Sequence, residues 1–329
     1  MTDHIRWGIL GASGFAQKIM APALNEARRS RLVALATHDP ARAEPFAAIA
    51  PGLRVHDSYD ALLADPGIDA VYIPLPNALH VEWSIRAARA GKAVLCEKPI
   101  ALCAADFDAL IAARDATGCL IAEAWMPAHH PQWALVRDLI AEGALGTLHT
   151  VTGVFTYGLD DPGNIRLSAD LAGGALRDVG VYPIGSFRFA TGLEPEILWA
   201  DAISEGGVDT SAWVQARAGA TRFGFHVSMR ATRYQSMVFE GSRARLSVVA
   251  PFNPGQYGQA DVIVSADDAP TRVHAFPDAR QYARQVEAFA ASLLDGVEFA
   301  YPLEAARGTQ VALDGVFAWL EQKGNVYGS

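Results

Sequence analysis

The sequence predicts an α/β fold in two parts: a doubly wound parallel sheet in residues 1–124, and an α+β domain built on a large, mainly antiparallel sheet in residues 125–329. Three observations predict it. Short apolar strands alternate with helical segments through the first third of the chain. A glycine-containing turn follows the first strand and opens a helix. From about Trp125, β-rich runs of alternating polarity replace the strand–helix alternation.

The composition is that of an ordinary globular protein. Hydrophobic residues make up 51% and charged residues 19% of the 329 residues, a length that suggests about two domains. The net charge of -9 and the lack of a basic run argue against nucleic acid and anionic membranes as partners. The three cysteines match no zinc spacing and are interpreted as reduced thiols, and no long apolar run occurs, so we expect a cytoplasmic protein. His129 and His130 are adjacent and lack a carboxylate at metal spacing, so no metal site is predicted.

The first domain begins with the apolar strand IRWGIL, residues 5–10, followed by a turn and a helical pattern that runs to Ala27. The next strand is predicted over residues 31–37. Asp39 and Pro40 then predict a helix start, because aspartate caps helix N-termini and proline suits the first helical position. Further strands are predicted over residues 69–75, 92–97 and 119–125, with helices over 78–90 and 104–117. Ligands of such sheets bind beyond the carboxyl ends of the strands, where PLPN, EKP and EAW fall here.

The turn after the first strand is a modified dinucleotide-binding fingerprint. That fingerprint needs glycines for a tight turn and for close approach of the backbone to a pyrophosphate at a helix N-terminus. Ser13 stands where its second glycine belongs. Alone, the motif also fits an incidental strand-to-helix turn, but its place inside a βαβ unit favours a Rossmann domain. The predicted cofactor-binding residues of the turn are Gly11, Ala12, Ser13, Gly14, Phe15 and Ala16.

The end of the second strand bears on the choice of cofactor. A carboxylate there would bind the ribose of NAD, whereas small polar and basic groups suit the 2′-phosphate of NADP. Asp39 is already predicted to cap a helix, and it lies beyond the end of the strand. Thr37, His38 and Arg42 could hold a phosphate, so the sequence favours NADP, with NAD as the alternative. His38 contributes a full charge only when it is protonated.

The second domain is predicted from runs with strand periodicity. Alternating polarity bounded by glycine, proline and aspartate turns indicates a largely antiparallel sheet. The runs cover residues 147–158, 196–204, 212–219, 221–230, 234–249 and 260–266, and helices over 279–294 and 303–323 follow them.

One apolar stretch of this domain, GGALRDVGVYPIG at residues 173–185, carries a carboxylate and a phenol. Asp178 and Tyr182 are four residues apart, so on a helix they share one face. One interpretation is structural: Asp178 caps a helix, Pro183 lies in its first turn, and Tyr182 is a core aromatic. The other interpretation is that the two polar groups act at one place.

Several long motifs in order resemble the glucose–fructose oxidoreductase / inositol dehydrogenase (Gfo/Idh/MocA) family, and within it the branch of NADP-dependent xylose dehydrogenases and dimeric dihydrodiol dehydrogenases. The resemblance covers essentially the whole chain. It rests on WGILGASGFA from Trp7, VYIPLPNALHVEWSIRAARAGKAVLCEKPIAL from Val71, EAWMPAHHPQ from Glu123 and NIRLSADLAGGALRDVGVYPIG from Asn164. It implies an NADP-dependent dehydrogenase acting on CH–OH groups, and a homodimer or higher homo-oligomer formed through the outer face of the second domain's sheet.

The resemblance also implies roles for particular residues. Lys98 of the EKP motif matches the family's catalytic lysine near the nicotinamide, and Asp178 and Tyr182 match the family's aspartate and its histidine or tyrosine. Without the other motifs, Glu97 and Lys98 would be interpreted as a surface ion pair. The cofactor side would further include Pro74, Leu75, Asn77, His80 and Glu97.

The implied chemistry suits these groups. Removing hydride from a carbon that bears a hydroxyl requires a base for the hydroxyl proton. A free tyrosine, with a pKa of about 10, is a poor base near neutral pH, but a neighbouring ammonium favours its phenolate. Tyr182 beside Lys98 is therefore the predicted proton acceptor, with Asp178 orienting the substrate hydroxyl or the lysine. The substrate would be a sugar hemiacetal or a related cyclic diol; the alternative is a cofactor-binding regulatory protein of the same fold without catalysis.

The sequence departs from the family's pattern at two places. Ser13 replaces a glycine of the pyrophosphate turn. Pro127 and Ala128 stand where relatives commonly have an aromatic residue and an arginine, which adds positive charge near cofactor and substrate. The candidates to line the altered substrate pocket are Trp125, Arg166 and Arg177.

Overall fold

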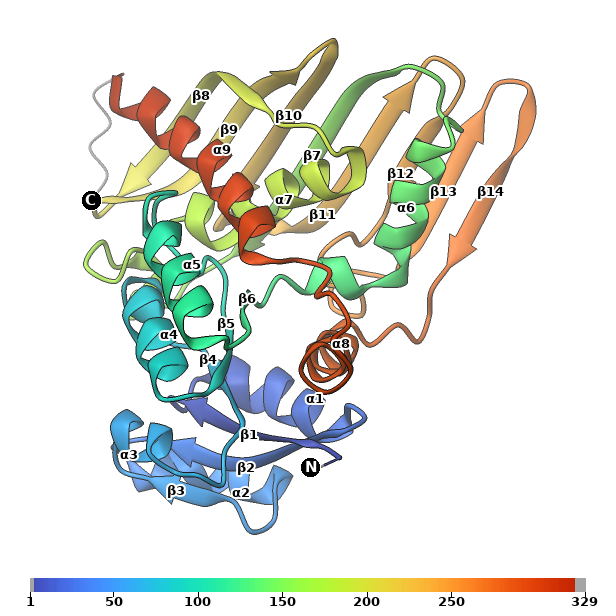
Figure 1. Ribbon diagram of the computed structural model, residues 1–329. Coiled ribbons are helices and arrows are strands. Elements are labelled where there is room, and N and C mark those ends of the chain that lie inside the picture. The colour runs from blue at the N-terminus through green and yellow to red at the C-terminus, as the bar shows by residue number, and fades with distance from the viewer. Residues whose placement is uncertain (1–2, 323–329) are drawn as a thin grey trace. The chain divides into compact units, whose positions relative to one another are not determined.

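The computed structural model describes residues 3–322 (Figure 1). By its internal contacts the chain divides into two compact units. The first unit takes in the chain up to His129 together with Arg280–Arg307, and the second takes in His130–Ala279 and the chain from Gly308 onward. Residues 280–307 thus return to the first unit after the chain has passed through the second. Among the described residues, no helix combines the length and the apolar character that crossing a bilayer requires.

The first unit is built on a six-stranded parallel sheet in the order β3-β2-β1-β4-β5-β6 (Figure 1). Its strands are β1 (Ile5–Leu10), β2 (Ser30–Ala36), β3 (Arg54–His56), β4 (Ala70–Ile73), β5 (Ala93–Cys96) and β6 (Ile121–Glu123). Strand β3 was not predicted, because this three-residue strand has no buried position and therefore no apolar signal. Strand order reverses between β1 and β4, and doubly wound sheets bind ligands at the carboxyl end of that switch point.

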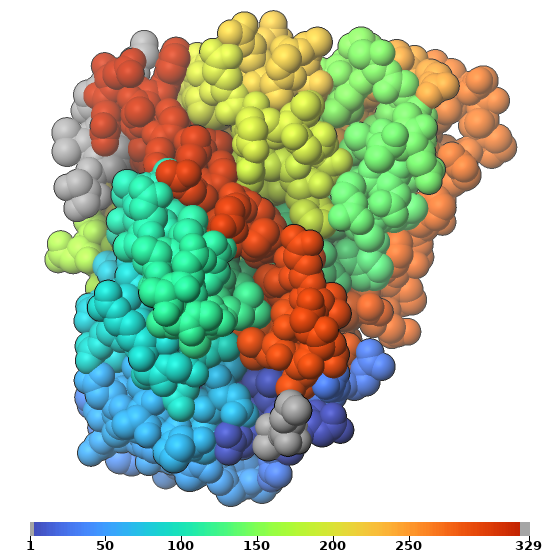
Figure 2. Space-filling model, in the orientation of Figure 1, coloured from blue at the N-terminus to red at the C-terminus, as the bar shows by residue number. Residues whose placement is uncertain are grey.

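Helices flank this sheet. They are α1 (Ala21–Glu26), α2 (Glu44–Ile49), α3 (Tyr59–Leu63), α4 (His80–Arg89), α5 (Asp106–Thr117) and α8 (Gln281–Asp295). Helices α4 and α5 pack side by side and form one continuous surface in the space-filling view (Figure 2). Phe289 of α8 packs on Trp7 of β1 with ring centroids 5.0 Å apart, which explains why α8 belongs to this unit.

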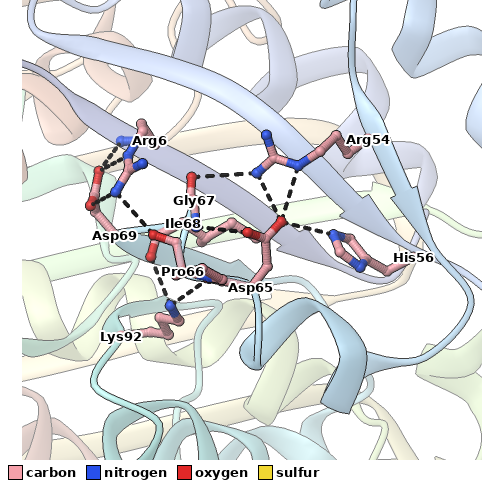
Figure 3. Close-up of polar contacts among 9 residues, drawn as sticks. All are labelled: Arg6, Arg54, His56, Asp65, Pro66, Gly67, Ile68, Asp69 and Lys92. Atoms are coloured by element: carbon pink, nitrogen blue, oxygen red, sulfur yellow. Dashed lines mark hydrogen bonds and ion pairs between the residues drawn. The ribbon is translucent and has the colours of Figure 1, made fainter.

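A polar network ties the amino ends of the parallel strands together (Figure 3). Arg6, near the start of β1, pairs with Asp69, just before β4, at 2.7 Å. Lys92, just before β5, is buried and donates from Nζ to the carbonyl oxygens of Asp65 and Ile68, both at 2.8 Å. Parallel strands have their carboxyl ends at the other edge, so this network stabilises the sheet away from the ligand-binding edge.

The second unit is built on an eight-stranded sheet in the order β14-β13-β12-β11-β7-β10-β9-β8. Strands β10 and β7 pair in parallel and the other neighbours pair antiparallel, as the sequence predicts. The edge strand β14 was missed, because its residues are almost all exposed and its pattern is polar. The strands are β7 (Leu148–Gly158), β8 (Glu196–Glu205), β9 (Val208–Ala218), β10 (Thr221–Ser228), β11 (Arg230–Gly241), β12 (Arg245–Val248), β13 (Asp261–Ala266) and β14 (Ala269–Ala275).

Helices α6 (Pro131–Ala141) and α7 (Val181–Thr191) cover one face of this sheet, and α9 (Leu303–Gln322) runs beside α7 (Figure 1). The core between helices and sheet is aromatic. Phe187 of α7 stacks on Phe223 of β10 with centroids 4.4 Å apart, and Trp133 of α6 meets Phe239 of β11 edge-on at 6.4 Å. This packing fixes α7, which carries Tyr182, on the sheet.

The opposite face of the same sheet carries apolar side chains without a helix over them. Trp213 of β9 and His226 of β10 stack there with centroids 4.8 Å apart. Trp199 is 42% exposed, Ile203 53% and Tyr234 55%. Within the described residues, this outer face therefore exposes several large apolar side chains.

Candidate active site

In the first unit, the turn after β1 has the form that a dinucleotide needs. Gly11 has a φ of +99°, which favours glycine, and a Cβ there would also make a tight contact, 3.0 Å from Cδ2 of Leu75. A Cβ at Gly14 would meet nothing within 4 Å, which leaves the backbone open there. Oγ of Ser13 accepts a hydrogen bond from the N–H of Ala16 at 3.1 Å. Serine therefore supports the turn at the place where the fingerprint has glycine.

The segment after β2 lies against this turn. Nη2 of Arg42 donates to the carbonyl oxygen of Ala12 at 2.7 Å and so brings a guanidinium to the glycine turn. The side chain of Asp39 accepts from the N–H of Ala41 and caps the 3₁₀ turn Pro40–Ala43, as predicted. The hydroxyl of Thr37 bonds to the backbone of Asp39 at 3.3 Å. Asp39 forms the cap. The groups at this strand end that could bind a ribose phosphate are therefore the hydroxyl of Thr37, the exposed imidazole of His38 and the guanidinium of Arg42.

Tyr59, the first residue of α3, is a neighbour of the turn that the sequence analysis missed. Its ring centroid lies 6.0 Å from that of His38 and 4.9 Å from that of Trp83. Its hydroxyl would lie 3.4 Å from a Cβ at Gly11. Burial raises the pKa of Tyr59, with the charge of Arg42 opposing, so the phenol stays protonated. No apolar periodicity between β2 and β4 places this residue beside the glycine turn.

Lys98 follows β5 by two residues, at the carboxyl edge of the parallel sheet. The hydroxyl of Tyr72 in β4 donates to Oε1 of Glu97 at 2.6 Å, and Oε2 of Glu97 accepts from the backbone N–H of Lys98 at 3.4 Å. The Lys98–Pro99 peptide bond is cis. Burial and the Glu97 carboxylate raise the pKa of Tyr72 well above its usual value, so its hydroxyl remains a donor. Glu97 thus ties the lysine loop to the neighbouring strand.

His80 and Glu123 contact the backbone of the two residues that follow Lys98. Nδ1 of His80 lies 2.7 Å from the carbonyl oxygen of Pro99, and Nε2 lies 2.8 Å from that of Leu75. Oε2 of Glu123 accepts from the N–H of Ile100 at 2.9 Å. Burial raises the pKa of Glu123 to about 7, with the nearby lysine ammonium opposing. Burial also lowers the pKa of His80.

The remaining first-unit candidates lie on neighbouring turns. Pro74 and Leu75 directly follow β4, and Asn77 begins the 3₁₀ turn Asn77–Leu79. Trp125 is fully buried and stacks on Tyr301 with centroids 4.5 Å apart. Phe15 packs edge-on against Tyr282, and Pro127 and Ala128 lie in the 3₁₀ turn Met126–His129.

The adjacent histidines take separate structural roles. Burial lowers the pKa of His129 to about 3, and its ring packs 4.9 Å from that of Phe299. His130, in the second unit, accepts from the N–H of Gln132 and caps α6. Over residues 3–322, no group of three or more His, Cys, Asp or Glu side chains has the arrangement of a metal site.

In the second unit, Asp178 gathers two donors on one oxygen. The hydroxyl of Tyr157 in β7 donates to Oδ2 at 2.6 Å, and Nε of Arg166 lies 3.0 Å from the same atom. Burial and the Asp178 charge raise the pKa of Tyr157, so its phenol stays protonated. Asp178 likewise raises the pKa of Arg166 and keeps the guanidinium charged. Tyr157 was not predicted as a site residue, although the alternation of the predicted strand puts it on the same face as Phe155.

Asp178 is not a helix cap, so that part of the structural interpretation is wrong. It lies inside a π-helical turn, Leu176–Gly180, that leads into α7, and neither segment has a side-chain cap. Asp209 of β9 supports the start of this turn instead, because its Oδ2 accepts from the N–H of Leu176 at 2.7 Å. Burial raises the pKa of Asp209 to about 7. Gly174, with φ +114°, leaves room for that carboxylate, since a Cβ there would lie 2.3 Å from Oδ1.

Tyr182 lies in an aromatic cluster, as the core-aromatic interpretation expects, and is 6% exposed. Its ring centroid is 5.3 Å from that of Phe155 and 5.4 Å from that of Phe252. Tyr257 packs edge-on against Phe155 at 5.5 Å, and the guanidinium of Arg233 lies over the Tyr257 ring at 5.3 Å. The phenol is therefore held by packing on several sides.

The two arginines predicted to line the substrate pocket lie in different places. Arg166 reaches the carboxylate, as described above. Arg177 instead lies over the ring of Phe317 in α9, 4.9 Å from its centroid, and burial lowers its pKa. Adjacent helical residues point in different directions, so a position next to Asp178 in sequence does not bring Arg177 to it.

Comparison with known proteins gives matches along most of the chain. Residues 5–124 match the GFO_IDH_MocA oxidoreductase family with its NAD-binding Rossmann fold, and residues 133–247 match the GFO/IDH/MocA C-terminal domain. An uncharacterized oxidoreductase of Rhizobium meliloti is 39% identical over 95% of this chain and 96% of its own length. D-xylose 1-dehydrogenase (NADP(+)) 2 of Haloferax volcanii is 35% identical over 88% of this chain and 89% of its own.

A solved structure has a similar fold along nearly the whole length. A 3-ketoreductase from Actinomadura kijaniata, in complex with NADP and TDP-benzene, superimposes with a TM-score of 0.89 and 31% identity. The similarity covers 96% of this chain and 97% of that one.

Proposed function

The chain belongs to the GFO/IDH/MocA oxidoreductase family, and we propose that it transfers hydride between NADP and a CH–OH or carbonyl carbon of a sugar or a related cyclic diol. The family, the fold class and the oxidoreductase activity with a nicotinamide cofactor, all predicted from the sequence, are thereby confirmed. The observation that carries the proposal is the polar cluster in which Tyr157 and Arg166 hold Asp178 one helical turn before Tyr182. The presence of Lys98, Asp178 and Tyr182 together favours the enzyme over the regulatory alternative.

In this proposal Tyr182 accepts the proton of the substrate hydroxyl, and Asp178 orients that hydroxyl. Bound NADP would supply the hydride acceptor. Lys98 would favour the phenolate of Tyr182 by its charge, because an ammonium nearby lowers the cost of ionising a phenol. The contacts from Tyr157 and Arg166 to Oδ2 order the carboxylate of Asp178 for this role.

The proposal requires that Lys98 and Tyr182 act on one substrate molecule. Lys98→Met and Tyr182→Phe should each lower turnover, and the double variant should be little worse than the poorer single variant, because the two groups act as a unit. Strictly additive losses would mean that they act at separate steps.

NADP is favoured over NAD by the groups at the end of β2. Arg42, Thr37 and His38 are present there, while Asp39 is committed to capping. The relatives that carry NADP in their names support the same choice. Titration of cofactor fluorescence at pH 6 and pH 8 tests it: NADP should bind more tightly than NAD at both values. Tighter binding of NAD at both values would defeat the choice.

The substrate class is tested with a panel. Aldoses, polyols and dihydrodiols are incubated with NADP and NAD, and keto-sugar nucleotides with the reduced cofactors, while the absorbance of the reduced cofactor is followed. The aldose arm follows the xylose dehydrogenase relative, and the nucleotide arm follows the 3-ketoreductase. Turnover in at least one arm is expected. Tight cofactor binding without turnover in any arm would favour the regulatory alternative.

We further propose a homo-oligomer, with a dimer as its smallest form, assembled through the outer face of the β8–β14 sheet. The exposed apolar side chains of that face, among them Trp199, Ile203 and Tyr234, need a cover. Light scattering should give at least twice 35.1 kDa, and Trp199→Glu should lower the measured mass. A monomer mass for the unmodified protein at micromolar concentration contradicts this assembly.

We propose a cytoplasmic location, because Cys96, Cys103 and Cys119 are all free thiols, as is usual in a reducing compartment. Cell fractionation with an antibody to the native chain tests the location.

A further inference from the structure

One peptide group in the lysine loop is held on both sides by buried side chains. The carbonyl oxygen of Pro99 lies 2.7 Å from Nδ1 of His80, and the N–H of the next residue, Ile100, donates to Oε2 of Glu123 at 2.9 Å. His80 is 1% exposed and Glu123 4%. A peptide group is planar, so a contact at its oxygen and another at its nitrogen together fix its orientation.

The two side chains come from elements on either side of β5. His80 is the first residue of α4, and its other ring nitrogen lies 2.8 Å from the carbonyl oxygen of Leu75 in the turn after β4. Glu123 is the last residue of β6. The loops after β4 and β5 and the end of β6 are therefore linked through this one peptide.

Fixing this peptide also restrains the backbone of Lys98. The ring of Pro99 limits its own φ to about -65°. With the peptide after Pro99 fixed, little backbone freedom remains between that peptide and Lys98. Glu97, held by Tyr72, restrains the other side of the lysine.

These residues bind the backbone as well as filling space. A buried carboxylate and a buried imidazole both lose hydration, and here they contact an N–H and a carbonyl oxygen that apolar side chains would leave without these partners. Polar groups that are buried at a cost beside a reactive residue are commonly retained for their geometry.

We propose that His80 and Glu123 are positioning residues, which hold the Pro99–Ile100 peptide and thereby fix Lys98 for its part in catalysis. The inference rests on the proposed function for the role of Lys98, but the clamp itself can be tested without a substrate.

The first test is hydrogen exchange at the Ile100 amide of the full chain with NADP present. Glu123→Ala removes the acceptor and should speed exchange by about tenfold or more. Glu123→Gln keeps an acceptor oxygen and should keep exchange slow. Unchanged exchange in Glu123→Ala, or equally fast exchange in Glu123→Gln, overturns the clamp.

The second test is kinetic and uses the best substrate of the panel. His80→Phe and Glu123→Ala should each lower kcat by about 10- to 100-fold, and for Glu123→Ala the KM and NADP affinity should change by less than about threefold. In a Lys98→Met background, the same changes should have no further effect, because a residue that acts through Lys98 has nothing left to position. Equal losses in both backgrounds would show a general structural role and overturn the proposal.

Lys92 provides the matched control. It is also buried in the first unit and also contacts two backbone carbonyl oxygens, but it does so at the amino edge of the sheet (Figure 3). Lys92→Met should lower stability and leave both kcat and Ile100 exchange unchanged; a fall in kcat like that of His80→Phe would contradict the proposal. If no sugar is turned over by the unmodified protein, the proposed function fails, while the exchange experiment still decides on the clamp.

Discussion

Replacing Tyr157 by phenylalanine removes one hydroxyl from Asp178 and little else. The phenol of Tyr157 donates to Oδ2 of Asp178 at 2.6 Å, and its ring packs edge-on against Phe155, a contact that phenylalanine keeps. Arg166 remains 3.0 Å from the same oxygen, so the carboxylate is not left unpaired. The substitution therefore tests how much of the order of Asp178 depends on a single donor.

The magnitude follows from the charge and geometry of this bond. A hydrogen bond to a charged group is worth about 1.5–3 kcal/mol, and the partner that remains places this case near the lower end. We expect Tyr157→Phe to lower the free energy of unfolding by about 1.5 kcal/mol. If Asp178 orients the substrate, a similar loss in the transition state lowers kcat/KM about tenfold.

Two assays separate the effects. Urea unfolding gives the stability change, and the rate of cofactor reduction with the best sugar of the panel gives kcat/KM. Tyr234→Phe is the control, because it removes a phenol from the exposed outer face of the same sheet. Loss of stability without any loss of kcat/KM would refute the orienting role of Asp178, and no change in either quantity would refute the hydrogen bond itself.

Glu123→Gln should gain stability relative to the unmodified chain as pH rises. Burial raises the pKa of Glu123 from 4.5 to about 7, so the native state keeps a proton that the unfolded chain releases. The unmodified chain therefore loses up to about 3 kcal/mol of stability as pH rises between those two values. Urea unfolding of both proteins at pH 5 and pH 8 measures this loss, and an equal pH dependence of the two proteins would contradict the prediction. Gly174→Ala should cost about 2 kcal/mol or more, because φ is +114° and a Cβ would lie 2.3 Å from a carboxylate oxygen. Gly52→Ala, at φ +84° in open space, should lower stability by less when both variants are compared by thermal unfolding. Equal losses of stability would mean that the close contact at position 174 is relieved in the variant. Asp69→Asn breaks the 2.7 Å ion pair with Arg6 and should lower stability by about 1–2 kcal/mol without changing kcat, since it lies at the amino edge of the sheet; a changed kcat would show coupling between the two edges.

Local patterns in the sequence located the main elements and suggested the candidate site residues. A strand end followed by a glycine turn predicted the dinucleotide-binding domain, because tight turns and helix starts depend on residues close together in the chain. The EKP and GGALRDVGVYPIG motifs gave Lys98 and Asp178 by resemblance. Spacing also suggested one helical face for Asp178 and Tyr182, whereas the structure puts a π-helical turn before α7.

The partners of these residues could not be predicted, because the contacts that make them partners join distant positions. Tyr157 is 21 residues from Asp178 and belongs to a strand, and Asp209 supports a turn 33 residues before it. Glu123 stood out as a strand-end residue, but its bond to Ile100 depends on how β5 and β6 pair. Such contacts follow from sheet order and register, which the periodicity of one strand does not contain.

The account depends most on Tyr182 as the proton acceptor. Turnover of the best substrate is measured for the unmodified protein and for Tyr182→Phe across a range of pH, together with NADP affinity and thermal unfolding. The account predicts a fall in turnover of about 10²–10⁴-fold in the variant, loss of the limb that rises with pH below the pKa of free tyrosine, and nearly unchanged cofactor binding and stability. A Tyr182→Phe protein with unchanged turnover and an unchanged pH profile would contradict it and leave Tyr182 as a core aromatic alone.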